Sequence, residues 1–263
     1  NDLLLGGWGN DILIGGSGAD RLVGGRGVDT VRAFGGGSFV LTTRTLTQGS
    51  STDLLTGVEA AELTGGTGDD RFSVSGWFGR AVLIGGDGSD RVVLKRGGNF
   101  TLNDAALWVS ATNRFTLSGI EQATLIGGIG NDRFTVSGWT GTASLDGGGG
   151  IDTVLAIGDS NFTLTDSSLI RSIGGVVLLM RVERAMLLGG PGDHVIDASG
   201  FTRGSVVLVG GPGADRLLGG SKRDLLIGGS GADIQNAGNG DDLLIGGSTQ
   251  FDNSPTALDA LLA

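Results

Sequence analysis

The stretch GGWGNDILIGGSGADRLVGGRGVDTVR, residues 6–32, repeats one pattern of nine residues three times. Each repeat has the form GGxGxD followed by a short apolar run, so a glycine-rich turn alternates with a segment of strand length. The pattern returns as GGPGADRLL, GGSKRDLLI, GGSGADIQN and AGNGDDLLI over residues 210–245. A single repeat cannot bury its own apolar face, so repeats of this kind must stack. We therefore predict coils of two nonapeptides, 18 residues each.

A longer period lies between these two regions. The segments GGTGDDRFSVSGW (65–77), GGIGNDRFTVSGW (127–139) and GGPGDHVIDASGF (189–201) begin 62 residues apart. Each such unit contains two turns of the GGxGxD type, 20 or 21 residues apart, so we expect three coils of about that length per unit. The third coil would carry a divergent loop, around 104–112 and 166–174, in place of the glycine turn.

These repeats predict an all-β fold, a parallel β-roll or β-solenoid with two short strands per coil. We expect nonapeptide coils at 1–32 and 210–247, a solenoid of 62-residue units at 33–209, and a cap or linker at 248–263, all in one continuous solenoid.

The last segment contains a helix signal. Ser254 is a suitable N-cap, Pro255 suits the first helical position, and the apolar sequence TALDALLA follows. We expect a short helix that caps the open end of the solenoid or begins the next domain. Because the sequence starts inside a repeat, we interpret the chain as a fragment of a longer protein.

Composition narrows the possible classes. The chain has 54 glycines in 263 residues but no triplet period, which excludes collagen, and its hydrophobic fraction of 39% argues against disorder. The net charge of −10 argues against nucleic acid or an anionic membrane as partner and favours bound cations. No apolar run approaches the about 18 residues that a membrane span needs.

The aspartate at the sixth position of the turn predicts a calcium site. Glycines at positions one, two and four allow positive φ and bring carbonyl oxygens inward, and the aspartate adds a carboxylate. Ca²⁺ takes about six to eight oxygen ligands, so two stacked turns are needed for one ion. The candidate aspartate pairs are Asp2/Asp20, Asp11/Asp29, Asp70/Asp90, Asp132/Asp152, Asp215/Asp233 and Asp224/Asp242. The glycines expected to supply carbonyl ligands are Gly6, Gly9, Gly15, Gly18, Gly24, Gly27, Gly65, Gly68, Gly85, Gly88, Gly127, Gly130, Gly147, Gly150, Gly210, Gly213, Gly228, Gly231 and Gly240.

Repulsion within such a ladder links calcium to folding. Two carboxylates about 5 Å apart repel by roughly 3 kcal/mol at an effective dielectric constant of about 20. We therefore expect the chain to be largely disordered without calcium and to fold when calcium binds. Plain turns without metal are the alternative, but they give the aspartate at position six no role.

The pattern GGxGxDxUx, with U apolar, resembles the RTX family, the haemolysin-type calcium-binding repeats. The resemblance is direct over 1–32 and 210–247 and intermittent between them. It implies a parallel β-roll, secretion in an unfolded state through a type I system, and calcium-triggered folding outside a bacterial cell. It also implies that the aspartates named above, with their GGxG carbonyls, are the ligands. The array is similar to those of large secreted bacterial proteins.

Several positions depart from the pattern. His194 occupies the sixth position in GGPGDH, so we expect a weakened site there unless Asp193 substitutes. Lys222 replaces a glycine and places positive charge near Asp224. We expect poorer strand register at 234–236 and no full site at the divergent loops.

An enzyme is not expected. His194 is the only histidine and cysteine is absent, which excludes a Cys–His dyad and an HExxH zinc site. No GxSxG motif occurs. The residues at positions three and five of the turns form no regular Thr/Asn file, which argues against an ice-binding face.

Two further sets of residues recur with the 62-residue period, and we place both on the opposite edge from the calcium turns. Trp77, Trp139 and Phe201 form either an aromatic platform for sugar or a cover for the coil edge. A second set, Glu59, Glu121 and Glu183, either binds a cation or accepts backbone N–H groups.

The function that we predict is that of a non-catalytic, extracellular calcium-binding region of a larger secreted or cell-surface protein, a stiff spacer or adhesin stalk. The alternatives are an adhesive module that binds cell-surface glycans, and an accessory array of an enzymatic domain outside this sequence.

Overall fold

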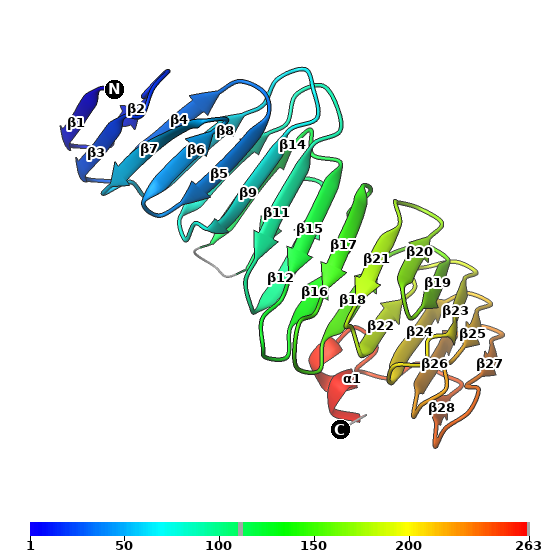
Figure 1. The fold of residues 1–263 in the computed structure, drawn as a ribbon. Helices are drawn as coiled ribbons and strands as arrows, with labels where there is room; N and C mark the ends of the chain where they lie inside the picture. The colour runs from blue at the N-terminus through cyan, green and yellow to red at the C-terminus, as the bar shows by residue number, and fades with distance from the viewer. Residues whose placement is uncertain (110–112, 262–263) are drawn as a thin grey trace. The chain divides into compact units, whose positions relative to one another are not determined.

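The computed structural model describes residues 1–109 and 113–261, in which all regular elements but one short helix are strands (Figure 1). Part of the loop expected at 104–112 and the last two residues of the segment 248–263 lie outside the described residues. The chain divides into two compact units, one formed by Asn1–Arg96 and Asp104–Leu125, the other by Gly97–Asn103 and Ile126–Ala263.

The first unit consists of strands in two sheets. In spatial order, its first sheet contains β1 (Leu3–Trp8), β3 (Arg21–Arg26), β7 (Ser51–Thr56), β6 (Thr45–Gln48), β5 (Ser38–Thr42), β9 (Arg71–Gly76), β11 (Arg91–Lys95) and β15 (Gln122–Ile126). Its second sheet contains β2 (Ile12–Leu13), β4 (Thr30–Phe34), β8 (Ala60–Thr64), β10 (Arg80–Ile84), β14 (Arg114–Ser118) and β13 (Ala106–Trp108). Successive coils pair parallel and in register, as where Leu3 lies opposite Arg21, 18 residues later.

The second unit has the same two-sheet architecture. One sheet contains β17 (Thr142–Asp146), β21 (Val177–Met180), β20 (Ser168–Arg171), β19 (Phe162–Thr165), β23 (Val195–Gly200), β25 (Arg216–Leu218) and β27 (Ile234–Asn236). The other contains β12 (Asn99–Asn103), β16 (Arg133–Thr135), β18 (Thr153–Ile157), β22 (Arg184–Leu188), β24 (Val206–Pro212), β26 (Leu225–Ser230) and β28 (Leu243–Ile245). The predicted fold class, a parallel β-roll, is confirmed in both units.

The prediction of three coils per 62-residue unit is wrong. From β16 to β23, which are 62 residues apart, the chain changes sheet five times, so one period makes two and a half coils. The residues assigned to a third coil instead form an antiparallel meander, β19–β20–β21, within one sheet. Because a meander folds back without crossing to the other sheet, it adds residues but no coil. The strands β5–β6–β7 form the same meander in the first unit.

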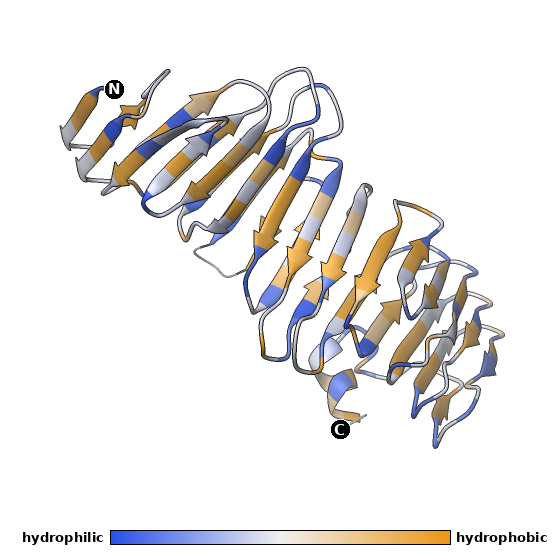
Figure 2. Ribbon diagram, viewed as in Figure 1, coloured by the Kyte–Doolittle hydropathy of each residue, from blue (hydrophilic) through white to orange (hydrophobic). Residues whose placement is uncertain are grey.

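The core lies between the two sheets of each unit and is formed by every second residue of the strands. In β9, for example, Phe72 and Val74 are fully buried while Arg71 is exposed. The rings of Phe39 and Phe72 stack with their centroids 5.1 Å apart, and those of Phe100 and Phe134 with 4.9 Å. Apolar residues are concentrated along the strands (Figure 2). This stacking from coil to coil is what aligns the turns.

The aromatic turn residues also belong to the interior. Trp77 and Trp139 are each 1% exposed and Phe201 is 0% exposed. The Trp77 indole N–H donates to the carbonyl of Arg80 at 3.2 Å. A sugar ring cannot stack on side chains that the coil encloses, so the interpretation of these residues as a sugar platform is wrong.

The predicted C-terminal helix is present as α1 (Pro255–Leu261). The backbone N–H of Leu258 donates to the Ser254 carbonyl at 3.0 Å, which closes its first turn. The buried side chain of Leu258 packs against residues of β18, β22, β24 and β26, among them Leu155 and Met186. An ion pair between Arg133 and Asp259 adds to this contact. The helix therefore covers a sheet face and does not cap the open end.

Candidate calcium sites

The turn aspartates form ladders, and all six predicted pairs are brought together. In each pair the backbone N–H of the first aspartate donates to Oδ1 of the second, which lies one coil further on. The donor–acceptor distances are 2.6 Å for Asp2/Asp20, 2.8 Å for Asp11/Asp29, 2.7 Å for Asp70/Asp90, 2.7 Å for Asp132/Asp152, 2.9 Å for Asp215/Asp233 and 2.8 Å for Asp224/Asp242. The turns are thus stacked as a two-turn calcium site requires.

The second carboxylate oxygen, Oδ2, is what distinguishes these aspartates from ordinary turn residues. Within the described part of the chain, seven of them have an Oδ2 that is buried and has no hydrogen-bond partner: Asp11, Asp20, Asp29, Asp90, Asp152, Asp215 and Asp233. A buried carboxylate oxygen without a donor is costly unless a cation compensates its charge. These oxygen atoms are therefore suited to bind a cation as its ligands.

Three other turn aspartates have both oxygens satisfied by backbone N–H groups. Asp70 accepts from Gly37 and Gly66, Asp132 from Gly98 and Gly128, and Asp224 from Val206 and Gly220. The two remaining predicted ligands, Asp2 and Asp242, lie at the outermost turns. Asp2 is exposed and Asp242 is half-buried. The predicted sites are therefore not equivalent.

At the first glycine of most turns, a backbone carbonyl oxygen of the next coil lies close to the carboxylate oxygen Oδ2 of the turn aspartate. A Cβ atom on Gly6 would lie 2.6 Å from Oδ2 of Asp11 and 2.5 Å from the carbonyl oxygen of Gly24, the first glycine of the next coil. Gly210 lies in the same way between Asp215 Oδ2 and the Gly228 carbonyl. Carboxylate and carbonyl oxygens, with no hydrogen between them, are the ligands that Ca²⁺ prefers.

The glycine positions have two different roles. In most turns the second and fourth glycines take the left-handed conformation, for example Gly7 at φ 100° and Gly9 at φ 111°. The expectation of positive φ at the first position is wrong, because glycine is needed there for close approach and not for its φ. Gly66 and Gly128 are not left-handed either, and their N–H groups donate to Asp70 and Asp132.

Sequence reasoning missed how the ladders end. Glu59, Glu121 and Glu183 do not lie on the opposite edge, because each accepts the N–H of a turn aspartate through Oε2. The distances are 3.0 Å from Asp29, 2.9 Å from Asp90 and 3.0 Å from Asp152.

Asp53 in β7 was not predicted at all, because it belongs to no glycine turn. Its Oδ1 accepts the backbone N–H of Asp20 at 2.9 Å, so it extends the Asp2/Asp20 ladder. Only the position of β7 beside β3 could have revealed it.

The electrostatics of the ladders disfavour carboxylate charge in the absence of a cation. Burial raises the pKa of Asp90, and the charges of Asp70 and Glu121 raise it further, against a lowering by the Asp70 N–H. Burial likewise raises the pKa of Asp53, Asp152 and Asp215. For Asp224, burial raises the pKa to about 6, with the charge of Asp242 adding to the effect.

His194 takes the place of an aspartate in one ladder. Its Nε2 lies 2.7 Å from Oδ1 of Asp159, and its Nδ1 lies 3.2 Å from Oδ1 of Asp215. Asp193 does not substitute, because its Oδ1 accepts the N–H of Ala214 at 2.7 Å. The imidazole thus fills the space between two carboxylates, where the other ladders offer only oxygens.

Replacing this ring by a carboxylate is expected to add a site. We predict that His194→Asp binds one calcium ion more than the parent chain, because the introduced carboxylate and Asp215 would then form a regular pair. Counting bound calcium after equilibrium dialysis measures the change. The control is His194→Asn, because asparagine has the length of aspartate but no charge. This variant should add no calcium ion. An unchanged count in the aspartate variant would contradict the prediction.

Another departure has less effect than expected. The strand at 234–236 keeps its parallel register, with Ile234 opposite Arg216 and Asn236 opposite Leu218, so the prediction of poorer register is wrong. Lys222 is exposed, and its carbonyl faces the turn at Gly240.

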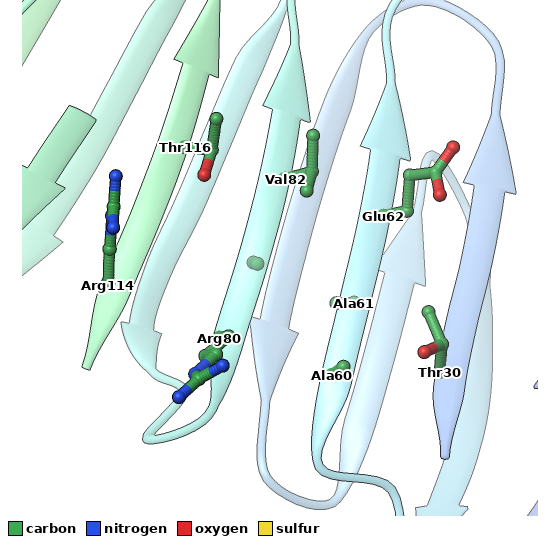
Figure 3. A pocket seen from close by; sticks show the side chains of 9 residues that line it. Thr30, Ala60, Ala61, Glu62, Arg80, Val82, Arg114 and Thr116 are labelled. Atoms are coloured by element: carbon green, nitrogen blue, oxygen red, sulfur yellow. The ribbon is translucent and has the colours of Figure 1, made fainter. Parts of the chain in front are cut away.

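A hollow of about 520 Å³ lies on the outward face of β4, β8, β10 and β14 (Figure 3). Glu62, Arg80 and Arg114 are among the residues that line it. None of its lining residues is a candidate calcium ligand, and Glu62 is paired with Arg32 at 2.8 Å.

Side chains alone do not make these sites. Over residues 1–109 and 113–261, no three Asp, Glu or His side chains gather in a way that could hold a metal ion. The further oxygens that the structure offers beside these carboxylates are backbone carbonyls, such as that of Gly24. In the same residues, no helix has the length and apolar character that crossing a membrane requires.

Comparison with known proteins agrees with this geometry. A family model of the RTX calcium-binding nonapeptide repeat matches the chain in four copies, at residues 1–36 and 209–244. No curated protein matches the chain. The matched residues contain the terminal ladders, including Asp11/Asp29 and Asp215/Asp233. Residues 1–36 and 209–244 of this chain therefore belong to the RTX calcium-binding repeat family.

Proposed function

We propose that this chain is the calcium-binding structural region of a larger secreted or cell-surface bacterial protein. It folds when it meets calcium outside the cell, and it serves as a stiff spacer or adhesin stalk. The observation that carries the proposal is the set of seven buried, unpartnered Oδ2 atoms, six of which lie beside a backbone carbonyl oxygen of the next coil. External calcium supplies the missing charge, so the cation acts as a folding signal.

A structural role also agrees with the state of the one histidine. Both ring nitrogens of His194 are in contact with carboxylates, and the side chain is 4% exposed. It is therefore held as part of a turn and is not presented to a substrate.

Calorimetric titration with calcium tests the proposal on a matched pair of variants. Asp215→Asn removes a buried, unpartnered oxygen, whereas Asp193→Asn changes an exposed carboxylate of the preceding turn that only accepts an N–H. We expect at least about tenfold weaker calcium binding at one site for Asp215→Asn, which corresponds to about 1.4 kcal/mol, and no change for Asp193→Asn.

Magnesium provides the second control. Mg²⁺ is smaller and demands near-octahedral geometry, so it should not replace Ca²⁺ at equal concentration. Equal responses to the two ions, or equal affinities in the two variants, would contradict the proposal.

A further inference from the structure

Three turns outside the RTX repeat matches lie where a further cation would complete a ladder. These turns are GVE (57–59), GIE (119–121) and RVE (181–183), and none contains a GGxGxD motif. Each follows the last aspartate of a ladder by one coil, so that the Glu side chain accepts the N–H of Asp29, Asp90 or Asp152.

The aspartates that face these turns have the clearest need for a cation. Asp29, Asp90 and Asp152 are each 0% exposed, and the Oδ2 of each has no hydrogen-bond partner among the described residues. A Cβ atom on Gly24, Gly85 or Gly147 would collide with this Oδ2 and with the carbonyl oxygen of residue 57, 119 or 181. A buried carboxylate oxygen and a backbone carbonyl oxygen therefore converge at each glutamate turn with no hydrogen between them.

The preceding turn in the middle of the chain provides a comparison. Oδ2 of Asp70 faces the Asp90 turn but accepts the N–H of Gly66 at 2.6 Å, and Oδ2 of Asp132 accepts that of Gly128 at 2.6 Å. In these ladders, the oxygen that lacks a donor thus faces the glutamate turn and not the next GGxGxD turn.

The backbone of the glutamate turns keeps the carbonyl in place. Gly57 and Gly119 are left-handed, at φ 60° and 59°, and Arg181 at the same position has φ 50°. Arg181 is the only non-glycine residue with positive φ in the described part of the chain. A left-handed arginine is uncommon, so its presence indicates that the surrounding structure requires this carbonyl direction.

We propose that Glu59, Glu121 and Glu183 each complete a calcium site with the aspartate and carbonyls of the preceding turn. The sites are Asp29/Glu59, Asp90/Glu121 and Asp152/Glu183, and each extends its ladder by one ion. In each, the carboxylate of the turn aspartate, the glutamate and the carbonyl of residue 57, 119 or 181 offer the oxygen ligands that Ca²⁺ prefers. This inference rests on the proposed function, because it assumes that calcium binds the neighbouring turns.

Exchange of Glu121 for glutamine tests the inference. Glutamine keeps an oxygen that can accept the Asp90 N–H but removes the charge. Glu62→Gln removes a charge of the same kind from a strand and is the control. We expect Glu121→Gln to bind one calcium ion fewer than the parent chain, counted by equilibrium dialysis, and Glu62→Gln to bind as many. An unchanged count and affinity in Glu121→Gln would overturn the inference and leave the glutamate as an N–H acceptor only.

Variants at the two equivalent turns keep the inference testable if Glu121→Gln fails to fold. Glu59→Gln and Glu183→Gln repeat the test at separate turns, and Glu121→Asp, which keeps the charge, is expected to retain the ion. If Asp215→Asn weakens binding while none of the glutamine variants does, the inference fails and the proposed function stands. If the parent chain binds no calcium, both fail.

Discussion

Removal of calcium is expected to abolish most of the β structure of this chain. Seven aspartates bury an oxygen without a donor, and leaving a buried polar group unsatisfied costs about 1–3 kcal/mol each. Their sum is comparable with the about 5–15 kcal/mol by which folded proteins are usually stable. The far-ultraviolet circular dichroism signal of strands should therefore disappear in excess chelator and return when calcium is restored.

The same experiment has an internal control in magnesium. Magnesium added to the chelated chain at the calcium concentration that restores the signal should leave the spectrum disordered. A strong β signal that persists in excess chelator would contradict the prediction and would mean that core stacking, such as that of Phe39 on Phe72, suffices to hold the fold.

The calcium ladders were predictable from the sequence because the motif places an aspartate at the same position in each of two stacked turns. In a stack with 18 or 20 residues per coil, residues such as Asp70 and Asp90 must face each other, and the structure places them so. The burial of Trp77 and Trp139 was not predictable in the same way, since an aromatic residue at a turn looks exposed until stacked coils enclose it.

The meanders were not predictable because parallel and antiparallel strands share one sequence pattern. NFTLTDSSL at 161–169 alternates polar and apolar residues as a coil strand would, yet β19 and β20 run antiparallel. The same error in strand direction led to a wrong predicted position for the glutamates. With three full coils per unit, Glu121 falls on the opposite edge, whereas the two and a half coils of the structure bring it onto Asp90.

The calcium-free chain is expected to gain stability as the pH falls from 7 towards 4, which is opposite to the usual effect of acid. Burial raises the pKa of Asp53, Asp90, Asp152, Asp215 and Asp224, the last to about 6. A carboxyl group with a raised pKa in the folded state costs stability above that pKa. The cost is relieved as the pH falls towards the unfolded value of about 3.9. Asp224 alone, raised from 3.8 to about 6, accounts for about 3 kcal/mol of this difference.

The calcium-loaded chain should respond in the opposite sense, because protons compete with Ca²⁺ for the same oxygens. Circular dichroism at pH 7, 6 and 5 measures both forms, with calcium removed by a chelating resin, since soluble chelators weaken in acid. Asp224→Asn, which cannot titrate, should show a smaller gain in the calcium-free form. A calcium-free signal that is equal at pH 7 and pH 5 would contradict the prediction.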